Sequence, residues 1–499
     1  MLLLDLNHDI LFRILSFLDA YQLLTIFRVS SVIRQLALSK QLWIRLLREL
    51  ESLGCSDLPP DDKLDQLSAE ELIIELRRLV CGPTSWAQAD ESPAVVRRSF
   101  SYPFPSTERL NDRHVGLSAG GRFFFVSSRT QFSCFETMTG RTVWRYEGWV
   151  HGFAERVLES GRVIELLLLI PRGEITRVVL KRIDFATGEN TDLLEAQMDR
   201  AAVDPYWFRA QIVGNLLVVP FLTEVEEEES RFDPAFIVID RTREEYLWMR
   251  FTAHFIHQAV AFLPDHIAVI SVDPDPSDDT VHAVFRVYPL SCLSDYWTPI
   301  DPTAVMNDTK AVVPDENTDS IFSQSFLLHD HPINYEFPGH IALAAHRNPL
   351  RHDAFVLTAY LANDYPNWRD DDFDESAYPQ LPGWASFQTF HVELEPTITI
   401  RPGRTVDAPV ALVDPCISFP RYGMHHHEDS AQDNSFQEAV YTVKDRVTTR
   451  LSIPLLDQSL IERSHRLGQP HVPLKAVLSA YGGVVIALSA ENVYIESHM

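Results

Sequence analysis

Apolar residues at the start of the chain recur at the spacing of an amphipathic helix. Within residues 6–18 they lie three and four positions apart, so they would line one broad face of a short helix. Asn7 is a favourable N-cap residue for this helix, because its side-chain oxygen can accept an unpaired backbone N–H of the first turn. Two more apolar sets follow at residues 23–27 and 32–47. The pattern predicts three short amphipathic helices.

Three helices of this size would bury little apolar surface by themselves, because small domains are only marginally stable. Apolar surface that they cannot cover among themselves must be covered by something else. One interpretation is that the helices pack on the rest of the chain, which periodicity alone favours. The other is that they dock on a partner protein.

The order of residues in this segment resembles the F-box, a three-helix module. The resemblance covers about a tenth of the chain and rests on the run 6–19, Gln22-Leu23-Leu24, Val29-Ser30, Arg34, Leu36-Ala37 and Leu42-Trp43. F-box modules dock on the Skp subunit of cullin–RING ubiquitin ligases. The resemblance therefore implies an adaptor that brings a protein to ubiquitination and has no chemistry of its own.

The resemblance also implies which residues meet the Skp subunit. We expect a set of apolar residues to divide between the small core of the module and the Skp contact, with the first helix mainly at the contact. Replacing Ile10 and Leu11 by Ala should then remove docking. The set is Leu6, Ile10, Leu11, Ile14, Leu15, Leu18, Leu23, Leu24, Val29, Leu36 and Trp43.

A further helix is predicted at residues 68–79. Ser68 and Glu71 have the spacing of a capping box, and Gly82-Pro83 would end the helix. A Pro- and Ser-rich strip at 99–107 then suggests a domain boundary. We divide the chain into an F-box at 1–50, a helical and Pro-rich linker at 51–107 and a β-rich substrate-binding domain at 108–499.

The pattern beyond residue 108 is typical of short strands. A polar turn, a buried apolar run and a more alternating strand begin at Gly120 and recur at Gly482. Similar starts lie at Gly161, Gly214, Pro264 and Gly339, and a degenerate copy lies at 439–453. Repetition at roughly 40 to 75 residues, with almost no helix, indicates a β-propeller.

The predicted fold is therefore α+β and multidomain, with an N-terminal three-helix F-box followed by an all-β propeller. About seven blades fill the span, and six or eight also fit. A pair of β-sandwiches is the structural alternative.

The charge of the chain is strongly negative, at −27, which argues against a nucleic-acid-binding surface. Residues 1–50 nevertheless carry six Lys or Arg against four Asp or Glu, a net +2 that leaves −29 for the remainder. A slightly basic module suits an acidic partner, and Skp-type subunits are acidic as a family. The acidic remainder would favour a basic target protein, or it serves solubility alone.

The five cysteines are far apart and odd in number, which fits a reducing compartment rather than a disulfide framework or a zinc site. The N-terminus lacks the features of a signal peptide, and the longest aliphatic run, 166–170, is too short to cross a membrane. We therefore expect an intracellular protein, in the cytoplasm, the nucleus or both, without a membrane or nucleic-acid partner.

Other chemistry-bearing residues do not indicate an active site. His425, His426 and His427 are consecutive residues of a predicted solvated loop and cannot all converge on one metal ion. The Glu run 226–229 and the Asp run 370–372 are predicted to lie on loops, where they would be solvated or bind a basic peptide. Residues 139–144 resemble one repeat of quinoprotein dehydrogenases, but an export signal and vicinal cysteines are missing. No cofactor or metal is expected.

The preferred hypothesis is a substrate receptor of a Skp–cullin–F-box ubiquitin ligase. The F-box would bind the Skp subunit and, through it, the cullin–RING ligase, while the propeller would bind an unknown target protein. The alternative is a scaffold outside any ligase that uses both parts for protein–protein interaction. A propeller enzyme is a third, weaker hypothesis.

Overall fold

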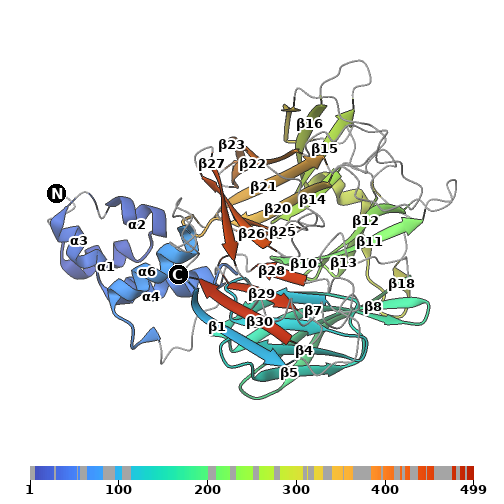
Figure 1. The fold of residues 1–499 in the computed structure, drawn as a ribbon, viewed down its shortest axis with the longest axis horizontal. Helices are drawn as coiled ribbons and strands as arrows, with labels where there is room; N and C mark the ends of the chain where they lie inside the picture. The colour runs from blue at the N-terminus through green and yellow to red at the C-terminus, as the bar shows by residue number, and fades with distance from the viewer. Residues whose placement is uncertain are drawn as a thin grey trace.

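N-terminal helices are followed by many strands in several sheets, so the predicted order of helices and strands is confirmed (Figure 1). The computed structural model describes residues 6–26, 28, 30–52, 54–56, 64–81, 96–103, 114–199, 210–224, 232–250, 258–274, 281–306, 312, 320–329, 340–351, 353–363, 384–394, 397–408, 416–418, 422–427, 437–444, 447–453, 475–478, 481, 484–488 and 492–498.

The helices form one group at the side of the β-structure (Figure 1). We call this group the helical module and the strands from β1 onward the body. The helices of the module are α1 (His8–Leu15), α2 (Ala20–Ile26), α3 (Ser31–Ala37), α4 (Lys40–Ser52) and α6 (Ala69–Cys81).

Helix α1 begins as predicted but is shorter than the apolar pattern. The Asn7 side chain accepts the backbone N–H of Asp9 at 3.3 Å, which confirms the predicted N-cap. Leu6 and Leu18 lie outside α1, at its two flanks. The apolar spacing therefore extends beyond α1 into the segments on either side of it, where it does not correspond to one face of a helix.

The prediction of one continuous third helix over residues 32–47 is wrong, because the structure divides this segment between α3 and α4. The break lies at Leu38 and Ser39, whose backbone N–H groups donate to Arg34 and Leu36. The Trp43 indole then donates to the Ala37 carbonyl at 2.8 Å. This bond satisfies a carbonyl that the end of α3 leaves unpaired, and it fixes the angle between the two helices.

Helix α6 confirms the predicted capping box. The Ser68 N–H donates to the Glu71 carboxylate at 2.7 Å, and the Glu71 N–H donates to Ser68 Oγ at 3.2 Å. These bonds hold the pKa of the Glu71 carboxyl below its ordinary value, the backbone bond to Ser68 contributing most. Its apolar stripe of Leu72, Leu76 and Leu79 is buried.

The described strands form seven sheets, and each contains a run of four antiparallel strands. The first three runs are β2 (His114–Leu117), β3 (Phe123–Ser127), β4 (Gln131–Glu136) and β5 (Thr142–Glu147); β6 (Gly152–Leu158), β7 (Val163–Arg172), β8 (Ile175–Asp184) and β9 (Asn190–Asp199); and β10 (Gln211–Val213), β11 (Leu216–Glu224), β12 (Phe232–Asp240) and β13 (Glu245–Arg250).

The next three runs are β14 (Gln258–Leu263), β15 (His266–Pro274), β16 (Val281–Pro289) and β19 (Phe322–His329); β20 (His340–Arg347), β21 (Ala354–Asn363), β22 (Trp384–Glu393) and β23 (Thr399–Ala408); and β24 (Cys416–Ser418), β25 (Tyr422–His427), β26 (Gln437–Lys444) and β27 (Val447–Ile453). The seventh is β28 (Lys475–Leu478), β29 (Val484–Leu488), β30 (Asn492–His498) and β1 (Val96–Pro103). Short elements η4 (Glu159–Gly161), η5 (Leu290–Tyr296), β17 (Thr298–Pro299) and β18 (Val305–Met306) complete the described part.

One backbone hydrogen bond recurs in five consecutive sheets. In each, the residue after the third strand donates its N–H to the carbonyl of the residue before the second strand, at N···O distances of 2.8–3.1 Å. The side chains at these positions differ from sheet to sheet, so the repeat is a property of the backbone. The pairs are Thr137 and Arg122, Phe185 and Arg162, Arg241 and Asn215, Leu290 and Asp265, and Leu394 and Asp353.

Neighbouring sheets share their apolar cores in chain order. Separate buried clusters join the β2–β5 sheet to the β6–β9 sheet, that sheet to β10–β13, that to β14–β19, and that to β20–β23. The last sheets continue the series, because β23 lies against β27, β24 against β28 and β28 against β2. Each described sheet therefore packs on the sheets before and after it in the sequence.

The β-structure begins before residue 108. Strand β1 lies inside the segment 51–107 that we expected as linker, and it pairs antiparallel with β30, for example Phe100 with Ile495. The reason is that an edge strand needs only backbone donors and acceptors, which the Pro- and Ser-rich composition did not reveal.

Candidate docking surface

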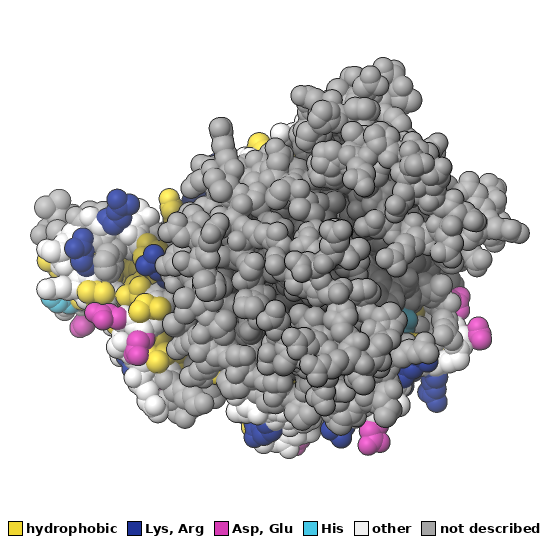
Figure 2. Space-filling model, viewed as in Figure 1, with side chains coloured by type: hydrophobic (Ala, Val, Ile, Leu, Met, Phe, Trp, Pro, Cys, Tyr) yellow, Lys and Arg dark blue, Asp and Glu magenta, His cyan; other side chains and the backbone are white. Residues whose placement is uncertain are grey.

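Exposed large apolar side chains are concentrated on the helical module. Seven of the twelve such residues in the described part of the chain lie on α1–α3 or their connections. Phe17 is 75% exposed and Ile10 51% exposed. Figure 2 shows apolar side chains gathered over the helices, on the left of the view. We call this set the docking surface: Ile10, Ile14, Phe17, Tyr21, Leu24, Val32 and Leu38.

Helical spacing places these residues together on each helix. Ile10, Ile14 and Phe17 are four and three residues apart, so they follow one side of α1 into its C-terminal turn. Tyr21 and Leu24 are three residues apart on α2. Helices α1 and α2 both pack against α3. The exposed apolar residues of α1 and α2 therefore lie on helices that are held together by α3.

The described members of the predicted Skp-contact set separate into three groups by burial. Ile10, Ile14 and Leu24 are exposed. Leu6, Leu18 and Leu36 are partly buried, and Val29 lies outside the described residues. The fully buried members are Leu11, Leu15, Leu23 and Trp43.

The first helix is therefore divided between the two roles. Leu11 and Leu15 face the core, about 100° around the helix from Ile10 and Ile14. Apolar spacing could not show which stripe was covered, because both stripes are apolar. The proposed double replacement of Ile10 and Leu11 would mix a surface change with a core change.

Four exposed residues were missed by the sequence interpretation. They are Phe17, Tyr21, Val32 and Leu38. Phe17 carried a usable signal, because it lies seven positions after Ile10 and three after Ile14.

The opposite side of the module packs on the body, so the first of the two interpretations holds for that side. Helix α4 lies against β6 and η4. A buried cluster that contains Leu47, Leu72 and Leu76 also contains Val356 and Tyr481 from two sheets of the body. We call this contact the junction. It attaches the helices to the body through buried apolar groups.

Tyr481 provides the polar centre of the junction. Its hydroxyl donates to the Arg347 carbonyl at 2.9 Å, and its N–H donates to the Ala119 carbonyl at 2.9 Å. The Cys55 thiol is hydrogen-bonded to the same hydroxyl, and it must donate, because a hydroxyl carries one proton. Burial raises the pKa of Cys55 to about 12 and raises that of Tyr481 well above its ordinary value.

The turn between β20 and β21 joins the body to α2. The Leu350 carbonyl accepts the Tyr21 N–H at 3.1 Å, in the first turn of the helix. The Arg351 guanidinium lies over the Tyr21 ring, with Cζ 4.6 Å from its centroid. Arg351 also pairs with Glu393 at the end of β22. Tyr21 therefore belongs both to the docking surface and to the contact with the body.

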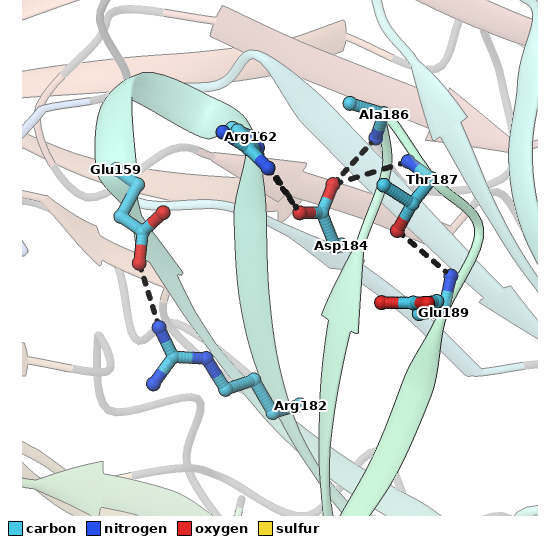
Figure 3. Close-up of polar contacts among 7 residues, drawn as sticks. All are labelled: Glu159, Arg162, Arg182, Asp184, Ala186, Thr187 and Glu189. Carbon is cyan, nitrogen blue, oxygen red and sulfur yellow. Dashed lines mark hydrogen bonds and ion pairs between the residues drawn. The ribbon is translucent and has the colours of Figure 1, made fainter.

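A second polar cluster lies at η4 and the turn between β8 and β9 (Figure 3). Arg162 donates to the Asp184 carboxylate at 2.8 and 3.0 Å, and Arg182 donates to Glu159 at 2.6 Å. Asp184 also accepts the N–H groups of Ala186 and Thr187. The Arg162 bond holds the pKa of Asp184 below its ordinary value. The carboxylates of Asp184 and Glu159 are both paired within this cluster, which indicates a structural role.

Gly161 occupies a position in this turn that favours glycine. It has a left-handed φ of +72°, and a Cβ at this position would overlap the Arg122 guanidinium of the preceding sheet. The predicted start at Gly161 thus marks a place where two sheets approach closely.

The other charged segments were only partly located. The Glu run 226–229 and the Asp run 370–372 lie outside the described residues. The prediction of a loop at His425, His426 and His427 is wrong, because these residues end strand β25 and pair with β26.

Two further findings concern the described residues. No group of three or more His, Cys, Asp or Glu among them could hold a metal ion. None of the helices that the structure describes is both long and apolar enough to cross a membrane.

No protein-family model and no curated protein matches the chain. Among solved structures, Kuenenia stuttgartiensis hydrazine synthase is similar with a TM-score of 0.36 and 11% identity, over 79% of this chain and 99% of that chain. The WD40 domain of SCAP from fission yeast has a TM-score of 0.32 and 9% identity, over 80% and 98%. Domains 1–2 of Drosophila Semaphorin 1b have 0.28 and 9%, over 82% and 87%. None of these is an F-box protein, and the likeness is distant.

Proposed function

We propose that this protein is a substrate-recognition adaptor of a Skp–cullin–F-box ubiquitin ligase. The helical module is the F-box and binds an acidic Skp-type subunit through the docking surface. The body binds the target protein. The protein acts inside the cell, and its contribution to catalysis is positioning, because it raises the effective concentration of target lysines near the ubiquitin-conjugating enzyme.

The observation that carries the proposal is the exposure of Ile10, Ile14 and Phe17. A module that served only as a cap on the body would bury its apolar residues against the body, as α4 and α6 do. Here a second apolar side remains open on the helices that carry the F-box pattern. The F-box pattern comes from the sequence and the exposure comes from the structure, and both support a partner contact on the same helices.

The body is interpreted as a propeller of seven blades. Seven four-stranded antiparallel runs, the recurrent backbone bond and the packing of each sheet on its neighbours in chain order support this arrangement. The pairing of β1 with β30 supports closure, since one sheet takes strands from both ends of the body. A pair of β-sandwiches would need fewer and larger sheets packed face to face in two pairs.

The target is proposed to meet the body at the end away from the helices. The β20–β21 turn contacts α2, and the β10–β11 turn accepts a hydrogen bond from Arg156, at the end of β6 beside η4. Strands β11 and β21 run from these turns to the opposite ends of their sheets, because neighbouring strands are antiparallel. Residues 225–231 and 364–383, which follow β11 and β21 in the sequence, contain four and six Asp or Glu and one Arg each. Their composition favours a basic target segment.

Partner capture by the full chain tests the proposal. Ile10→Ala with Ile14→Ala should lose recovery of a Skp-type subunit, because each change removes apolar contact of on the order of 2 kcal/mol. Ile74→Ala is the matched control, since Ile74 is 65% exposed on α6 and lies outside the docking surface. Equal recovery with the double variant and the control would refute the assignment.

Recovery of a cullin with the complex separates an adaptor from a scaffold. If the protein is a ligase adaptor, the cullin is recovered together with the Skp-type subunit, and neither is recovered with the Ile10 and Ile14 double variant. A scaffold brings down the Skp-type subunit alone.

A further inference from the structure

We propose that the docking surface is composite, and that Arg351 of the body gives the partner a cationic contact beside the apolar residues of the helices. This inference rests on the proposed function, because it concerns the same partner. It adds that the partner is recognised by both parts of the chain at once, and that its segment facing Arg351 is acidic.

The described residues around Arg351 are joined to one another by hydrogen bonds. The Asn348 side chain accepts the Leu350 N–H at 2.9 Å, and the Asn348 carbonyl accepts the Arg351 N–H at 3.1 Å. The Asn348 N–H donates to Ala354 at 2.8 Å, which closes the turn against β21. Leu350 packs on the buried cluster of the junction. The position of Arg351 is therefore set before any partner arrives.

Arg351 reaches the docking surface through Tyr21. Its guanidinium covers the Tyr21 ring at 4.6 Å, while 37% of its side chain stays exposed. Tyr21 is itself 46% exposed and shares its side of α2 with Leu24. Among the described residues the guanidinium donates to Glu393 alone, through Nη1. A guanidinium has five N–H donors, so it can pair with a second carboxylate.

The charge around the docking surface favours an acidic partner. Arg13, Arg28 and Arg34 are exposed on the helices or their connections, in the part of the chain with net charge +2. The remainder of the chain has a net charge of −29, so Arg351 is a cation of the acidic body that lies beside the more basic helices. Complementary charge at the edge of an apolar contact speeds association and selects the partner.

The test measures the affinity of the full chain for a purified Skp-type subunit at low and at physiological salt. Arg351→Glu should weaken binding about tenfold at low salt, and the loss should shrink as salt rises. Arg351→Lys should weaken it less, since it keeps the charge and loses the planar fork. Arg243→Glu is the matched control and should bind like wild type. Arg243 is likewise an exposed turn arginine paired with a carboxylate, Asp240, at 3.4 Å.

Hydrogen exchange of the peptide containing Tyr21 distinguishes a direct contact from a displaced helix. We expect its protection in the free Arg351→Glu protein to match wild type. Wild-type affinity of Arg351→Glu would overturn the inference, as would a loss of affinity accompanied by loss of this protection. Concentration-dependent dimerisation that Arg351→Glu abolishes would also overturn it, because the occupant would then be a second copy of this chain. Failure of the Ile10 and Ile14 variant to lose the partner refutes the proposed function instead.

Discussion

The two sides of the helical module use the same residue types in opposite ways. At the junction, Leu47, Leu72 and Leu76 are buried against one another and against the body. On the docking surface, Ile10 and Phe17 are largely open. Both sides have the apolar periodicity of an amphipathic helix. The comparison teaches that periodicity shows where an apolar stripe lies, while only the fold shows what covers it.

The largest expected effect comes from a change on the buried side of the helical module. Trp43→Ala should lower the free energy of unfolding by about 3–5 kcal/mol, because the indole loses its packing and Ala37 loses a hydrogen-bond donor. Phe17→Ala should change it by less than about 0.5 kcal/mol, since the ring is exposed. Urea denaturation followed by circular dichroism measures both. Equal destabilisation by the two changes would mean that the docking surface is covered within the chain.

A medium effect is expected at the polar centre of the junction. Tyr481→Phe removes the donor to the Arg347 carbonyl and the acceptor of the Cys55 thiol, and should cost about 1–3 kcal/mol. Cys55 should also react faster with an alkylating reagent, because its surroundings open more often. Tyr21→Phe, which keeps the ring under Arg351, is the control. An unchanged Cys55 reaction rate in Tyr481→Phe would show that Tyr481 does not hold the junction.

A smaller effect concerns pH and the start of α6. The pKa of Glu71 is lowered in the folded state, so its stabilisation is present above the unfolded pKa and is lost as pH falls through the folded pKa. Glu71→Gln removes the titrating group, and its stability should fall less than that of wild type over this acidic range. Glu70→Gln, in the same turn, is the control. Identical pH dependence of wild type and Glu71→Gln would contradict the assignment.

The smallest effect is expected at the acidic connection of the body. Changing the four residues 226–229 from Glu to Gln should weaken capture of a basic target and flatten its salt dependence, because exposed charges are screened beyond roughly 8–10 Å at physiological ionic strength. Capture is measured at low and physiological salt. If capture and its salt slope stay unchanged, these residues serve solubility only.

The sequence alone predicted much of the local structure. The Asn7 cap, the Ser68 and Glu71 capping box and the strands after Gly120 and Gly482 all follow from short-range chemistry, and all were found. Such features depend on residues within a few positions of one another. Their hydrogen bonds and turns can therefore be predicted from residues that are close together in the sequence.

The features that were missed depend on distant residues. Whether Ile10 or Leu11 faces outward is decided by α3, and Tyr21 is placed by the Leu350 carbonyl, far away in the sequence. Strand β1 was taken as linker because its partner, β30, lies at the other end of the body. The recurrent backbone bond within the sheets involves no preferred side chain, so no spacing of residues could reveal it.

The late position of Tyr481 has a consequence for synthesis of the protein. The ribosome releases the helices first, with Ile10 and Phe17, but the centre of the junction is made hundreds of residues later. Strand β30 follows and only then gives β1 its neighbour. Under the proposed function, a chain that stops early would carry the docking surface without a finished body to present a target. It would act as a competitor of the complete protein.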